Sequence, residues 1–215
     1  MSILPQASLF LGIIPALFLL FLGLKGFDGY YKDKIVFLSF IIGIILGVIS
    51  AAMEILSLSL GILIIVLFPI LEQILKLIIL NVSRLQKQKS TVIYGLSLGL
   101  GFGSVFTPIS IILANFETDS IIIIASVIIG SFGIILLQAG TGIILGYGVF
   151  TGKILKYFLL TIIIHIPFTA WFFLTGIYQI EQTQILLIFY GLVVYWYSSN
   201  KIMKNILDKT KEKLK

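Results

Sequence analysis

The stretch Pro69-Ile70-Leu71-Glu72-Gln73-Ile74-Leu75-Lys76 organises this chain, because it places charged side chains inside a long apolar run. The run, from about 60 to 80, has the roughly 20 residues that a membrane-spanning helix needs. Glu72 and Lys76 are four residues apart, so they lie on one helix face and are predicted to pair. Ionisable groups at membrane depth usually face the interior of a bundle. The pair is therefore either a functional site or a packing device, and the sequence leaves both open.

The composition places the chain among polytopic membrane proteins. Of its 215 residues, 59% are hydrophobic and 11% are charged, whereas soluble domains are about 25% charged. The absence of cysteine excludes disulfides and thiolate chemistry, and the one histidine, His165, leaves any metal at most one imidazole ligand. The net charge of +6 comes from lysines beside apolar runs. We therefore expect the lipid bilayer, and not nucleic acid, as the partner.

The apolar runs predict an all-α, seven-helix transmembrane domain over residues 1–200 and a basic cytoplasmic tail over 201–215. The predicted spans are about 7–24, 35–55, 60–80, 92–114, 121–149, 154–175 and 184–200. Fourteen of the fifteen basic residues fall on one side, and Lys76 lies inside a span. The positive-inside rule then predicts an outside amino terminus and a cytoplasmic carboxy terminus. We expect the plasma membrane of a prokaryote, with the tail either on anionic headgroups or free in solvent.

The fourth predicted span carries glycines at every fourth position. Gly95, Gly99 and Gly103 form two overlapping GxxxG units, which leave a smooth face for a second helix. That helix belongs either to the same bundle or to another membrane protein, and the sequence leaves both open.

Polar side chains recur near the middle of three predicted spans. Glu72 lies in the third span, Gln138 in the fifth and His165 in the sixth, so they are predicted to meet at one depth. Gln138 and His165 also fit ordinary hydrogen bonds between helices. The expected polar core comprises Glu72, Gln73, Lys76, Gln138, Thr141 and His165.

Four motifs occur in a characteristic order. They are Ile14-Pro15-Ala16, Phe27-Asp28, Glu72-Gln73-Ile74-Leu75-Lys76 and Gly99-Leu100-Gly101-Phe102-Gly103. This order resembles the PrsW-type intramembrane proteases, whose superfamily includes the CAAX-processing membrane proteases and the anterior-pharynx-defective scaffold subunit of gamma-secretase. The resemblance extends over about 12–172.

The resemblance implies a degenerate protease motif. Family proteases carry a Glu-Glu pair followed by a basic residue, a Phe-x-x-x-Glu motif and two later histidines. The matching residues here are Glu72, Lys76, Phe102 and His165, and the departures are Gln73, Phe106, Gln138 and Thr169. Because a metal or general-base mechanism needs several groups around one water, we expect neither family-type peptidase activity nor a metal or other cofactor.

The scaffold branch resembles the chain in its seven spans, its outside amino terminus and a tandem GxxxG that begins Gly-Leu-Ser, as in Gly95-Leu96-Ser97. Gln138 departs from it, because that branch keeps a histidine there. The leading hypothesis is a non-catalytic scaffold or binding subunit, with the fourth span as a candidate contact for another membrane protein.

Two alternatives remain. One is a residual, zinc-dependent intramembrane peptidase, in which Glu72 is the general base and His165 a metal ligand or oxyanion stabiliser. The other is a small transporter or channel, in which Glu72 and His165 respond to protons.

Overall fold

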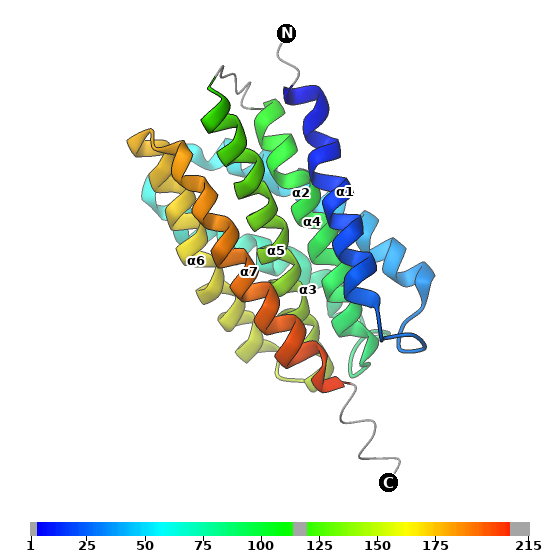
Figure 1. Cartoon of the computed structure of the whole chain (residues 1–215). Coiled ribbons are helices and arrows are strands. Elements are labelled where there is room, and N and C mark those ends of the chain that lie inside the picture. Colours follow the sequence, from blue (N-terminus) through cyan, green and yellow to red (C-terminus); the bar gives the residue numbers. More distant parts are fainter. Residues whose placement is uncertain (1–3, 114–119, 207–215) are drawn as a thin grey trace.

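The computed structural model describes residues 4–113 and 120–206, which form helices joined by short connections (Figure 1). The α-helices are α1 (Leu4–Leu24), α2 (Asp33–Ser57), α3 (Ile64–Leu80), α4 (Ser90–Leu113), α5 (Ile121–Thr151), α6 (Ile154–Tyr178) and α7 (Leu187–Tyr197). Short 3₁₀ segments, Leu58–Leu63 and Glu181–Leu186, lead into α3 and α7. A π-helical segment, Ser198–Met203, extends α7.

Six helical segments in the described part of the chain are long and apolar enough to cross a membrane, which indicates an integral membrane protein. They are Asp33–Ser57, Leu60–Leu80, Ser90–Ile112, Ile121–Thr151, Ile154–Tyr178 and Gln182–Met203. Each overlaps a predicted span, so the all-helical class and six of the expected spans are confirmed. The apolar part of α1, Leu9–Leu24, is shorter.

The most deeply buried helix is α4. Every residue from 91 to 108 is buried, and α1, α2 and α5 pack around this helix. In Figure 1, α4 and α5 occupy the middle of the bundle, with α1 on one side and α6 and α7 on the other. α3 packs against α6 and also contacts α2, α4 and α5. The charged stretch on α3 therefore faces the interior.

Glycine residues allow the backbones of α4 and α5 to come into direct contact. A Cβ atom at Gly95 would lie 2.2 Å from the carbonyl oxygen of Gly142, and one at Gly99 would lie 2.1 Å from that of Gln138. Gly103 faces α5 in the same way. The tandem glycine face is thus covered by α5 of the same chain. Of the two possibilities for this face, the structure shows packing within the bundle.

A second glycine contact joins α4 to α2. A Cβ atom at Gly101 would lie 2.1 Å from the Phe40 carbonyl oxygen, and one at Gly43 would lie 2.2 Å from that of Leu98. Close packing of this kind supplies the attraction between helices where lipid tails remove a hydrophobic driving force. α4 is therefore held on two faces by backbone contacts.

The end of the bundle extends beyond residue 200, where the sequence predicts the domain to end. Ile202, Met203 and Ile206 are buried in the core, whereas Lys201 and Lys204 are exposed. The first turns of the predicted tail thus belong to the bundle, because their apolar side chains pack inward. The rest of that tail, 207–215, and the loop 114–119 lie outside the described residues.

Candidate functional site

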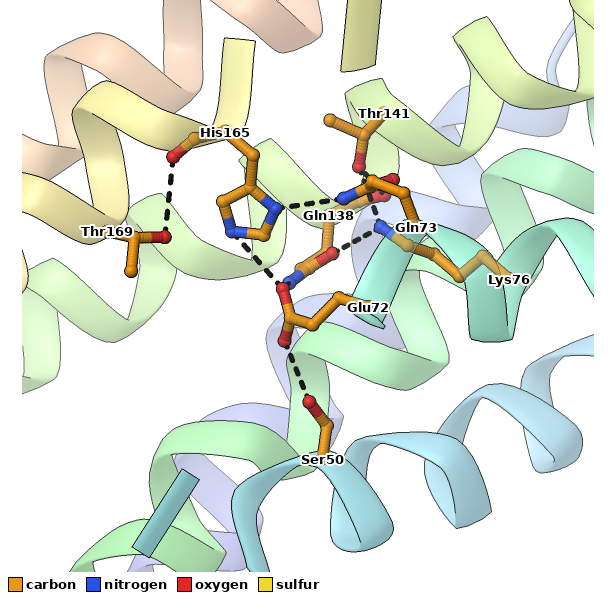
Figure 2. A network of polar contacts seen from close by, with 8 residues as sticks. All are labelled: Ser50, Glu72, Gln73, Lys76, Gln138, Thr141, His165 and Thr169. Atoms are coloured by element: carbon orange, nitrogen blue, oxygen red, sulfur yellow. Dashed lines mark hydrogen bonds and ion pairs between the residues drawn. The ribbon is translucent and has the colours of Figure 1, made fainter. Parts of the chain in front are cut away.

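A hydrogen-bonded network of polar side chains lies between α2, α3, α5 and α6 (Figure 2). Its members are Ser50, Glu72, Gln73, Lys76, Gln138, Thr141, His165 and Thr169. The three residues from α3 are fully buried, at 0% exposure. The structure thus brings together all six side chains of the expected polar core and adds Ser50 and Thr169.

The carboxylate of Glu72 accepts hydrogen bonds from three different helices. Ser50 Oγ donates to Oε1 over 3.0 Å, and Gln138 Nε2 donates to Oε2 over 2.9 Å. His165 Nε2 lies 3.2 Å from Oε2. A buried carboxylate is tolerated only when such partners replace its water shell. Glu72 therefore ties α3 to α2, α5 and α6 at once.

Lys76 is connected to Glu72 through a third residue. Among the described residues, His165 is the group within ion-pair distance of the Glu72 carboxylate. The Lys76 ammonium instead donates to Gln138 Oε1 over 2.5 Å and to Thr141 Oγ1 over 2.9 Å. The predicted direct pair is therefore replaced by a bridge, because the lysine side chain extends toward α5.

The amide of Gln138 is suited to this bridging position. Its oxygen accepts from the Lys76 ammonium, and its nitrogen donates to the Glu72 carboxylate. The amide dipole thus points its negative end at the cation and its positive end at the anion. The ring of Phe102, whose centroid lies 5.3 Å from Lys76 Nζ, adds a cation–π contact.

His165 receives a hydrogen bond on one ring nitrogen and donates from the other. The Gln73 amide nitrogen lies 2.8 Å from Nδ1, and the Glu72 carboxylate faces Nε2. An amide NH₂ group only donates, so Nδ1 must accept and Nε2 must carry the proton. Gln73 Oε1 is buried without a partner among the described residues.

We predict that ¹⁵N NMR of the detergent-solubilised protein will show a neutral imidazole with the proton on Nε2. The chain has a single histidine, so the spectrum reports His165 alone. In Gln73→Leu, the Nδ1 resonance should move and the Nε2 resonance should remain nearly unchanged. A proton on Nδ1 in the folded wild type would show that the Gln73 amide is oriented the other way and would contradict this arrangement.

A cavity of about 20 Å³ adjoins the network, which is room for about one water molecule. Its polar lining comprises Glu54, Glu72, Gln138, His165 and Thr169. Its apolar lining comprises Ile134 and four phenylalanines, Phe68, Phe106, Phe168 and Phe172. The arrangement can hold a water beside the paired Glu72 carboxylate and His165 imidazole, or can serve as a purely structural polar core.

Sequence reasoning missed two residues of α2 at this site. Ser50 bonds Glu72, and Glu54 lines the cavity and accepts from Ser110 Oγ over 3.3 Å. Their four-residue spacing places both on one face of α2, but it does not say which helix that face meets. Glu54 stood at the predicted end of its span, whereas α2 continues to Ser57.

Fold and site together define an integral membrane helix bundle with a buried, charged hydrogen-bond network. In the described part of the chain, no group of three or more histidines and carboxylates is placed to hold a metal ion. Comparison of the chain with protein-family models, with curated proteins and with solved structures gives no match. The resemblance to intramembrane proteases rests on its motifs alone.

Proposed function

We propose that the chain is a non-catalytic, seven-helix membrane protein related to the PrsW-type intramembrane proteases, acting as a scaffold or binding subunit. In this proposal α1 is the seventh span. The amino terminus lies outside, and the lysine-rich end faces the cytoplasm of a prokaryotic cell. Because α5 covers the glycine face of α4, a partner membrane protein would bind an outward face of the bundle.

The observation that carries the proposal is where the motif positions lie. Glu72, Phe106, Gln138 and His165 come from α3, α4, α5 and α6, and all four line the same small cavity. Positions that correspond to active-site residues in a family are expected to converge in this way. Their convergence supports the relationship to the protease family.

The side chains at these positions support the non-catalytic half of the proposal. Phe106 stands where the family has a glutamate, and phenylalanine neither binds metal nor accepts a proton. Gln138 stands where the family has a histidine, and its amide already bridges Lys76 and Glu72. A neutral amide is a poor zinc ligand and no general base. The remaining polar groups therefore serve to hold the helices together.

The test compares the wild type with a variant in which the family motif is restored. The variant combines Gln73→Glu, Phe106→Glu and Gln138→His, and zinc per chain is measured by elemental mass spectrometry after purification with added zinc. We expect well below one zinc per wild-type chain and a clear gain in the variant. Near-stoichiometric zinc in the wild type that is lost in both Glu72→Gln and His165→Ala would overturn the proposal, whether or not the restored variant folds.

A residual peptidase is the second candidate. It is favoured by the water-sized cavity that Glu72 and His165 both line, with a further carboxylate, Glu54, on its wall. It predicts cleavage of transmembrane peptides in proteoliposomes that Glu72→Gln abolishes. The non-catalytic proposal predicts equal, background cleavage by both proteins. The same small cavity gives no support to the transporter alternative, which requires a water-filled space open to one side.

A further inference from the structure

A second, larger pocket opens at the lysine-rich end of the bundle. Its volume is about 580 Å³, within the range of roughly 300–1,000 Å³ typical of small-molecule sites. It lies between the α1–α2 connection, the α3–α4 connection and the first turns of α2 and α4. The backbone N–H of Lys32 donates to the hydroxyl of Tyr94 over 3.2 Å and thereby joins the two sides.

Two cations line this pocket without a carboxylate partner. No acidic side chain among the described residues lies within 4.0 Å of the charged groups of Lys32 or Arg84, and both side chains are exposed. The two connections and the first residues of α2, stretches 25–34 and 81–89, together hold six basic and two acidic residues. The pocket therefore has a positive potential that favours an anion.

Neutral hydrogen-bonding groups complete the lining. Tyr30, Tyr31, Gln88 and Ser90 all border the pocket. Burial, followed by the charges of Asp28 and Asp33, raises the pKa of the Tyr31 phenol. A phenol is protonated at neutral pH even without this shift, so Tyr31 can donate to an anion. An arginine fork, an ammonium and hydroxyl donors together are the chemistry that recognises a phosphate group.

The location of the pocket favours a phosphate carried by a lipid. It lies at the beginning of two helices long enough to span a membrane, α2 and α4. On α2, Phe37 and Leu38 follow the pocket residue Ile35 and are 66% and 51% exposed. A headgroup in the pocket would thus have an apolar surface beside it for acyl chains. Basic pockets between spans at a cytoplasmic surface suit anionic headgroups.

We propose that this pocket binds the phosphate headgroup of an anionic phospholipid. The site is separate from the polar network, so the inference is independent of whether the protein is catalytic.

The test is a titration of the full-length, detergent-purified protein with phosphatidylglycerol, followed by native mass spectrometry. The pocket variant combines Lys32→Gln with Arg84→Gln. The control combines Lys153→Gln with Lys156→Gln, which removes the same charge from exposed lysines outside the pocket. In the pocket variant, loss of two charge-assisted contacts is expected to weaken binding of the first lipid by about tenfold or more. In the control variant, binding of the first lipid should weaken by less than about twofold. Equal weakening in both variants would overturn the proposal, because it would reflect general attraction to a basic surface.

A second arm separates a lipid from a soluble phosphate. Glycerol 3-phosphate is added to the lipid-loaded protein and to the lipid-free protein. For a lipid site, millimolar glycerol 3-phosphate is expected to leave the bound phosphatidylglycerol in place. If glycerol 3-phosphate binds the lipid-free protein tightly, displaces the lipid and is itself lost in the pocket variant, the lipid assignment is overturned in favour of a soluble phosphate ester.

Discussion

Gly99→Ala is expected to destabilise the bundle by about 3 kcal/mol or more. The added Cβ would lie 2.1 Å from the carbonyl oxygen and 2.7 Å from the carbonyl carbon of Gln138, and 2.9 Å from the Cα atom of Ala139. All three atoms are backbone, so no side chain can rotate away. The two central helices must separate, and the separation displaces the residue that bridges the charges of the network.

Gly176→Ala provides the matched control for this prediction. Gly176 lies inside α6, and apart from the backbone of its own helix no described atom lies within 4 Å of the position that its Cβ would take. The added methyl should therefore be neutral, or stabilising by about 0.5–1 kcal/mol through helix propensity. Both variants are compared with the wild type by thermal unfolding in the same detergent. If Gly99→Ala unfolds at the wild-type temperature, the close α4–α5 contact does not exist in solution.

Glu72→Ala is expected to cost about 3–5 kcal/mol of stability, the usual effect of removing one partner from a buried pair of charges. The Lys76 ammonium and the Gln138 amide would remain buried, with the carboxylate of the network gone. Glu72→Gln combined with Lys76→Met removes both charges and should recover a large part of the loss. An unchanged melting temperature of Glu72→Ala in detergent would contradict a structural role for the network.

A double-mutant cycle tests whether Gln138 transmits this effect. Glu72→Ala and Lys76→Ala are made singly and together, first in the wild type and then in a Gln138→Leu background. Coupling between groups in one hydrogen-bond network is expected to be about 0.5–3 kcal/mol. With leucine in place of the bridging amide, the coupling energy between Glu72 and Lys76 should fall markedly. Equal coupling in the two backgrounds would show that the charges interact directly and that the bridge is not important.

The sequence predicts the helices well but says little about how each is rotated. Lipid and protein core are both apolar, so a membrane helix shows no amphipathic pattern that marks its buried face. The exceptions are residues that fit only one environment. Glu72, Gln138 and His165 are predicted to meet because they lie at one depth and polar side chains at membrane depth usually face the bundle interior, and Gly99 is predicted to face a helix because glycine permits close approach.

The details that the sequence could not supply depend on side-chain direction and on helix ends. Spacing places Glu72 and Lys76 on one face of α3, but it does not say that the lysine reaches toward α5 for Gln138 and Thr141. Spacing also left Ser50 and Glu54 unassigned, because nothing in a single apolar run tells which neighbouring helix each of its faces meets. Contacts between distant segments decide both points.

The bridge between α3 and α5 also bears on how the protein is made. Lys76 and Glu72 are synthesised well before the residue that connects them, since Gln138 follows Lys76 by 62 positions and Glu72 by 66. A newly made α3 therefore carries an ammonium and a carboxylate without their later partner. Placing each of these charges in hydrocarbon costs about 2.5–3.5 kcal/mol. We therefore expect α3 to insert stably only once α5 has been translated and can supply Gln138. Gln138 would thus link the insertion of α3 to that of α5.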